Sequence, residues 1–207
     1  MRIETLETGG FVPAMHAMRN PMNSWHKNDT EYVYDGVVVG PNDQDLSRRL
    51  TKAGSEHCKH LRQIHVWVDM TLPRYVWSEM DTYGFSPKVS TSTMHKIDSR
   101  HLTKDDFETD IAQATIDDLN VEIDVMQGMS KIDLDGRNKQ RRIIKGKLPE
   151  SYLQMRTVDF TYATLLNIIN QRYNHKLIEW HEICNWIIGV DNFEELTGIE
   201  YKRRELS

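Results

Sequence analysis

The sequence has little cysteine and no long apolar run. Its two cysteines, Cys58 and Cys184, stand in unrelated contexts without metal-ligand spacing, and the nine histidines lack such spacing too. We therefore expect reduced thiols and no metal site. No stretch approaches the roughly 18 apolar residues of a membrane span, and residues 1–10 lack the apolar core of a signal peptide. These absences predict a cytoplasmic protein that binds no membrane.

Charge of one sign is not in large excess either. The net charge is −5, with 28% charged and 39% hydrophobic residues, a composition typical of a soluble globular protein. A negative net charge argues against a general nucleic-acid binder, so no DNA partner is expected, although local basic patches can hold a small anionic ligand. No compositional step divides the 207 residues, so we expect a single domain over residues 1–207.

What the sequence does have is a strongly apolar helical pattern in residues 165–180. Apolar residues recur there at three- and four-residue steps, the period of a helix with one face on a core. Asn167 and Arg172 interrupt the pattern. Because an arginine keeps its charge, one close to a core face needs a carboxylate, a carbonyl or a ligand phosphate. The alternative is an exposed arginine on the outer face of the helix.

Further patterns predict the elements around this stretch. Alternation in Arg62–Met70 indicates a half-buried strand, and the β-branched and aromatic residues of Glu31–Gly40 suit a strand or hairpin. Other helices are expected in four places. They are a helix capped by Asp43 and stopped by Gly54, a short helix from Thr71 to Asp81, an amphipathic stretch from Asp105 to Met126, and a helix from Lys176 to near Gly189.

The remaining segments are less regular. Phe11–Asn28 suits an ordered irregular loop, in which Arg19 and Trp25 line a pocket. The alternative is a surface loop whose Trp25 packs onto the core. The tail from Asn192 onward is expected to be peripheral. Together these patterns predict an α/β (α+β) fold, in which a small sheet packs against long helices at 162–173 and 176–188.

Two segments offer groups that bind anions. The hydroxyl run Ser90–Thr93 precedes His95 and Lys96, and hydroxyl and ammonium groups together hold a phosphate, although a solvated loop explains these residues equally well. A dense basic segment, 137–147, includes Lys145. Its alternative is a solvated charged face.

Residues 166–172, with His175 and the helix that contains residues 179–182, resemble the closing motif of the flavin-dependent thymidylate synthases, the ThyX family. Leu148-Pro149 also precedes Asn167 by the eighteen residues that the family shows. The family signature contains an Arg-His-Arg triplet, an Asn-Glu pair, a serine and an arginine. In this sequence they fall on Met80-Asp81-Thr82, Pro87-Lys88, Ser90 and Ser92. Only Ser90 matches.

The resemblance implies a ThyX-like fold with a small antiparallel sheet and long helices. It also implies a pyrimidine nucleotide of the dUMP type as ligand, with Ser90, Lys145 and Arg172 on its side and Asn167 nearer the flavin. FAD is the implied cofactor, yet most of its motif is absent, since a further asparagine and arginine of the family fall on Thr161 and Ala163. We therefore expect a degenerate flavin site and assign no cofactor.

The resemblance further implies a homo-oligomer, most simply a homotetramer, because the family shares its sites between subunits. Four tryptophans support this expectation, because one small core cannot readily bury the aromatic surface of all four, and a subunit interface can bury the rest. They are Trp67, Trp77, Trp180 and Trp186. The blocks Met18–Trp25 and Ser92–Lys96 are similar to uncharacterised relatives in gut bacteria and their phages.

Three functions of different classes fit these residues. The first is a divergent enzyme of a pyrimidine nucleotide, a thymidylate synthase-like methyl or hydroxymethyl transferase with altered cofactor binding. The second is a non-catalytic protein of phage origin that binds or sequesters a nucleotide, as a regulator or in counter-defence. The third is a structural subunit that kept only the fold and the oligomer interface. Bound flavin would favour the first, and co-purified nucleotide without flavin would favour the second.

Overall fold

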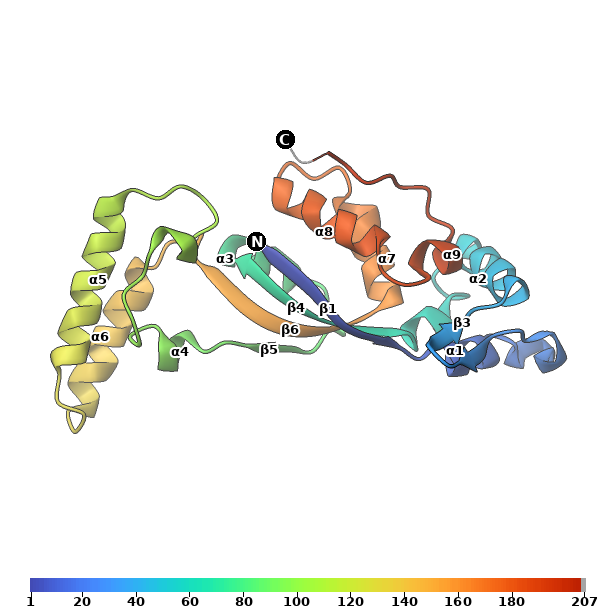
Figure 1. Cartoon of the computed structure of the whole chain (residues 1–207), viewed down its shortest axis with the longest axis horizontal. Helices are drawn as coiled ribbons and strands as arrows, with labels where there is room; N and C mark the ends of the chain where they lie inside the picture. Colours follow the sequence, from blue (N-terminus) through green and yellow to red (C-terminus); the bar gives the residue numbers. More distant parts are fainter. Residues whose placement is uncertain (206–207) are drawn as a thin grey trace. The chain divides into compact units, whose positions relative to one another are not determined.

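The computed structural model describes residues 1–205, which form a mixed α/β fold with a small antiparallel sheet (Figure 1). Four strands lie in the order β1-β4-β6-β5. Their bounds are Arg2–Gly9 for β1, His65–Pro73 for β4, Leu153–Thr161 for β6 and Lys88–Ser90 for β5. The α/β class predicted from the sequence is confirmed.

The chain groups into two compact units. The first unit contains residues 1–2, 70–82 and 89–156, and the second unit contains 3–69, 83–88 and the segment from Thr157 onward. Each of the four strands has residues in both units. The expectation of a single domain over 1–207 stays a prediction.

Strand β4 confirms the alternation that the sequence shows. Every second side chain is fully buried: Val66, Val68, Met70 and Leu72. The strand continues to Pro73, so the expected helix start at Thr71 is wrong, and helix α3 spans Arg74–Met80. The reason is Pro73, because a proline disfavours helical geometry in the residue before it and keeps Leu72 extended.

In the second unit, the two long predicted helices are confirmed as α7 (Tyr162–Arg172) and α8 (Ile178–Ile188), which pack on each other. Helix α7 begins where the Thr161 hydroxyl accepts a hydrogen bond from the Thr164 amide. Gly189 follows the last residue of α8, as expected. Buried apolar residues confirm the pattern of 165–180 at Leu165, Ile168, Ile169 and Trp180, and α8 continues its buried face with Ile183 and Ile187.

The tail after Asn192 is not peripheral. It forms helix α9 (Phe193–Thr197), and the Phe193 side chain is fully buried. The ring of Phe193 lies 5.3 Å from the ring of Tyr162, which also meets Phe11 edge-on at 5.8 Å. The expectation was wrong because so short an apolar segment shows no helical period of its own.

Residues 11–28 are also more regular than expected. Helix α1 spans Phe11–Met18, and the short 3₁₀ helices Asn20–Met22 and Trp25–Lys27 follow. The loop expected here is wrong because Pro13 lies in the first turn, where a helix tolerates proline. The predicted hairpin, in contrast, is confirmed: β2 (Glu31–Val33) pairs antiparallel with β3 (Gly36–Val38).

The first unit has its own core around two helices, α5 (Gln113–Gly128) and α6 (Leu134–Lys147), which pack side by side (Figure 1). The short helix α4 spans Thr93–Lys96. The expected helical stretch from Asp105 is wrong at its start, because Lys104–Asp106 forms a 3₁₀ turn and Phe107 pairs with Tyr152. The core residues are Ile97, Leu102, Phe107, Ile116, Leu119, Ile123, Met126, Ile144 and Leu148.

A buried ion pair joins α1 to helix α2 (Pro41–Ala53). The Arg19 Nε donates to Asp43 Oδ1 at 2.8 Å, and Nη2 makes a close ionic contact with the same oxygen at 2.6 Å, off the direction of a hydrogen bond. The cap predicted for Asp43 is wrong, because this carboxylate is committed to Arg19 and to the Thr30 hydroxyl. Asp29 instead accepts from the Asn42 and Asp43 amides of the first turn.

The tryptophans are better covered than the sequence suggested. Trp77 and Trp180 are fully buried within one chain, whereas Trp67 and Trp186 are partly exposed. The aromatic argument for an oligomer therefore fails for two of its four residues, and the homotetramer stays a prediction. Within residues 1–205, no helix combines the length and the apolar character that crossing a membrane requires.

Replacing Arg19 with Met should lower the free energy of unfolding by about 3–5 kcal/mol, because the Asp43 carboxylate then stays buried without its cation. The matched control is Arg49→Met, which breaks the exposed Arg49–Asp45 pair, whose side chains are 66% and 66% exposed, against 5% and 0% for Arg19 and Asp43. We expect a change of about 0.5 kcal/mol or less there. Urea unfolding measures both, and equal losses would contradict a stabilising role for Arg19.

Candidate functional site

The clearest candidate site lies where α7 ends, at Arg172. Its Nε donates to the Tyr83 hydroxyl at 2.8 Å. The guanidinium carbon lies 4.7 Å from the ring centre of Trp180 and 5.8 Å from that of Tyr83, and these two rings meet edge-to-face. The helix dipole and both π-faces favour a cation at this place. Arg172 is half-buried, so the alternative prediction, an exposed arginine on the outer face of the helix, is wrong.

Hydrogen bonds connect Arg172 to Asn167 along the same helix. The Tyr83 hydroxyl donates to Gln171 Oε1 at 3.0 Å, and Gln171 Nε2 donates to Asn167 Oδ1 at 2.9 Å. Two of the four predicted site residues, Arg172 and Asn167, thus belong to one hydrogen-bond network, and Asn167 lies at its exposed end. The sequence did not indicate Tyr83 as the partner of Arg172. The two residues are 89 positions apart, and the Gly-Phe-Ser-Pro turn that follows Tyr83 does not predict so distant a contact.

The other two predicted site residues belong to the first unit. Ser90 is the last residue of β5 and is exposed, and Lys145 is exposed on α6. Thr91, beside Ser90, is fixed to β6 because its amide and hydroxyl both donate to the Met155 carbonyl, at 2.9 and 3.1 Å. That Ser90 and Lys145 contact the nucleotide together with Arg172, as the resemblance implies, stays a prediction.

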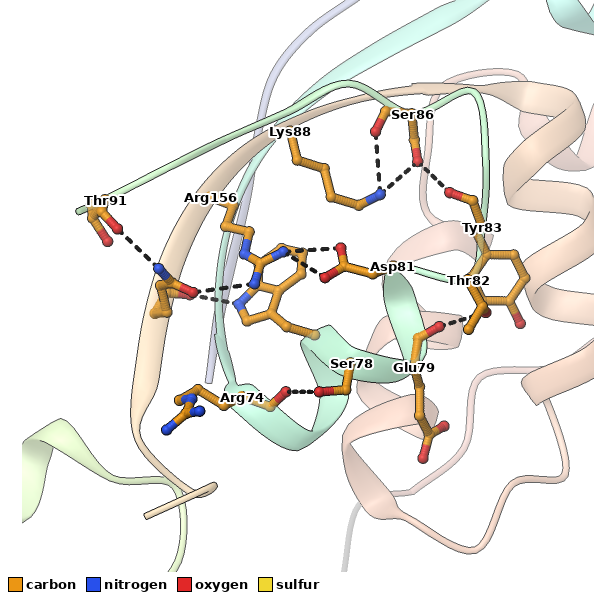
Figure 2. A network of polar contacts seen from close by, with 12 residues as sticks. Arg74, Ser78, Glu79, Asp81, Thr82, Tyr83, Ser86, Lys88, Thr91 and Arg156 are labelled. Carbon is orange, nitrogen blue, oxygen red and sulfur yellow. Dashed lines mark hydrogen bonds and ion pairs between the residues drawn. The ribbon is translucent and has the colours of Figure 1, made fainter. Parts of the chain in front are cut away.

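A second arginine, Arg156 on β6, was missed in the sequence. Its guanidinium carbon lies 4.4 Å from the ring centre of Trp77, and its Nη1 donates to both carboxylate oxygens of Asp81, at 3.0 and 3.1 Å. Figure 2 shows Arg156 and Asp81 facing each other in this network. Nη2 donates to Gln154 Oε1 at 3.2 Å. The one sequence signal for this site was an arginine within a strand pattern. No motif surrounds Arg156, so the sequence did not mark it as a site residue.

Asp81 of this network, with Met80 and Thr82 beside it, falls on the triplet to which the resemblance assigns flavin-binding cations. Met80 is fully buried, Asp81 is an anion paired with Arg156, and the Thr82 hydroxyl donates to the Glu79 carbonyl. Further along, the Thr161 hydroxyl is used as the cap of α7. These residues do not fit the cationic and amide set that the resemblance implies for FAD.

The thiols offer no activated nucleophile. Burial raises the pKa of Cys58, and it raises the pKa of Cys184 to about 12, so both thiols stay protonated near neutral pH. Within residues 1–205, no group of three or more histidine, cysteine, aspartate or glutamate side chains is placed to hold a metal.

A buried serine–histidine pair is structural. The Ser47 hydroxyl donates to the Leu196 carbonyl at 2.7 Å, so its oxygen accepts from His60 Nε2, also at 2.7 Å. The serine proton therefore points away from the imidazole, opposite to what general-base activation needs. Burial lowers the pKa of His60 to about 4, which keeps the ring neutral. The pair holds α2 to α9.

Comparison with known proteins supports the ThyX-like fold that the resemblance implies. No family profile and no curated protein matches the sequence. The structure matches a crystal structure of thymidylate synthase X (ThyX) from Helicobacter pylori with FAD and dUMP, with a TM-score of 0.70 and 14% identity over 95% of this chain and 97% of that one. A second structure of ThyX from Helicobacter pylori, complexed with FAD and dUMP, matches with a TM-score of 0.69, 15% identity and the same coverage. The chain has a ThyX-like fold.

Lowering the pH from 6.5 to 4 should destabilise the protein, because His60 binds a proton more readily in the unfolded chain, where its pKa is 6.5, than in the fold, where it is about 4. The contribution of His60 is present above pH 6.5, is lost as the pH falls towards 4, and is on the order of 3 kcal/mol. His60→Gln keeps an N–H donor for Ser47 but cannot titrate. Urea unfolding across this pH window should show a smaller loss for the variant, and equal losses would refute a neutral buried His60.

Proposed function

We propose that this chain is a nucleotide-binding protein, a divergent enzyme of a dUMP-type pyrimidine nucleotide with a degenerate flavin site. The ThyX structures that share its fold carry dUMP and FAD. The observation that carries the proposal is Arg172, whose guanidinium is fixed by the Tyr83 hydroxyl and the Trp180 ring. A planar cation that cannot lose its charge is well suited to a phosphate.

The other proposed nucleotide-binding residues are the remaining members of the predicted set. Ser90, Lys145 and Asn167 are exposed, and they offer a hydroxyl, an ammonium and an amide to a ligand. We also propose a homo-oligomer, most simply a tetramer, because the resemblance implies sites shared between subunits.

A second candidate is a non-catalytic protein that binds or sequesters the nucleotide. Two observations favour it. Asp81, an anion paired with Arg156, falls where the resemblance implies a flavin-binding cation, and the raised pKa of Cys58 and of Cys184 removes a thiolate nucleophile. Turnover of dUMP with reduced flavin and a one-carbon donor separates the two candidates, because only the enzyme consumes the nucleotide.

Replacing Arg172 with Ala should weaken dUMP binding by about 10- to 100-fold, the loss expected for one charge-assisted hydrogen bond. Calorimetric titration measures the effect. The matched control is Arg48→Ala in the same unit, because Arg48 Nε likewise donates to a fixed oxygen, the Glu195 carbonyl, but on α2. That variant should bind dUMP as the unmodified protein does.

The same titrations apply to Ser90→Ala and Lys145→Ala. Each should weaken dUMP binding, because each removes a donor for the phosphate. If Arg172→Ala unfolds the protein while neither of the other two changes any affinity, the nucleotide proposal is wrong. Arg172 is then part of the core, and the structural-subunit reading replaces it.

A further inference from the structure

Phe85 combines a strained backbone with a solvent-exposed ring. Its φ is +57°, in the left-handed region that bulky side chains rarely adopt, and the residue is 96% exposed. Within residues 1–205, the other non-glycine residues with positive φ are Asn23 and Asn192, and asparagine tolerates this conformation. Gly84, which adopts it at no steric cost, stands one residue earlier. The chain thus places an aromatic ring at the one position of this turn where it is costly.

The turn around Phe85 is firmly anchored. The Ser86 hydroxyl donates to the Tyr83 carbonyl at 2.8 Å, and Lys88 Nζ donates to the Ser86 carbonyl at 3.2 Å and to its hydroxyl oxygen at 3.0 Å (Figure 2). The Asp159 amide of β6 donates to the Pro87 carbonyl at 3.1 Å. Both sides of Phe85 are therefore fixed to the second unit, and the ring is held out to solvent by the fold and is not at the tip of a loose loop.

The turn begins at the residue that holds Arg172. Tyr83 accepts the Arg172 Nε–H, and two residues of chain span at most about 7 Å, so the Phe85 backbone lies close to that of Tyr83. The Tyr83 and Trp180 rings are already used as an edge-to-face pair around the guanidinium. Phe85, in contrast, offers an exposed π-face two residues along the chain from the tyrosine that holds Arg172. A nucleotide has the matching parts, a phosphate and a flat base.

We propose that Phe85 is the platform on which the base of the bound nucleotide stacks. This inference rests on the proposed function and deepens it, because it assigns the recognition of the base to a residue outside the four predicted ones. Stacking accepts any base, since each has a π-face, so Phe85 supplies affinity and the choice among bases lies elsewhere.

The test replaces Phe85 with Asn, which suits the left-handed backbone and cannot stack, and with Trp, which stacks. Each variant is titrated calorimetrically with dUMP and with 2-deoxyribose 5-phosphate, which has the phosphate but no base. Phe85→Asn should weaken dUMP binding by about 5- to 100-fold and leave the sugar phosphate unchanged. Phe85→Trp should keep the affinity for dUMP. Thermal unfolding should show Phe85→Asn to be at least as stable as the unmodified protein, because the backbone strain is relieved.

Three results would overturn the inference. If Phe85→Asn binds dUMP as the unmodified protein does, stacking is wrong while the proposed function stands. If that variant dissociates into smaller species by light scattering with its dUMP affinity unchanged, Phe85 covers a second copy of the chain. If the unmodified protein binds neither dUMP nor the sugar phosphate, the proposed function itself fails.

Discussion

Arginine keeps its charge at any pH that the protein meets, and this constraint shapes the end of α7. A half-buried guanidinium at Arg172 requires an acceptor, and the fold supplies the Tyr83 hydroxyl from a turn 89 residues earlier and the face of Trp180 from the next helix. These contacts fix the cation in one orientation. They also connect α7, α8 and the turn at residues 83–88 within the second unit, so the arrangement of the candidate site depends on this one charge.

A second arginine shows how this chain departs from the family that it resembles. Arg156 is stacked on Trp77 and paired with Asp81, which falls where the resemblance implies a cation for a flavin. The positive charge there is satisfied within the protein, whereas the hydroxyl, ammonium and amide of Ser90, Lys145 and Asn167 stay exposed. The residues that the resemblance assigns to the nucleotide thus keep groups that a ligand can contact, which is why nucleotide binding is the function that we propose.

Periodic patterns predicted most of the fold, because each such element buries one face at its own period. Strand β4 and helices α7 and α8 lie within a few residues of their expected bounds. The errors involve partners distant in sequence. Asp43 has the sequence context of a helix cap but pairs with Arg19, and α9 is ordered by the rings of Phe193 and Tyr162. At the site, the need of Arg172 for a partner was predictable and the identity of Tyr83 was not.

Calorimetric titration of the unmodified protein with dUMP, deoxyuridine and FAD tests the central claim, that a fixed arginine binds a nucleotide phosphate while the flavin site is degenerate. The account predicts saturable binding of dUMP, binding of deoxyuridine at least about 10-fold weaker because it has no phosphate, and binding of FAD weaker than that of dUMP. Equal affinities for dUMP and deoxyuridine, or FAD binding as tight as that of dUMP, would contradict it.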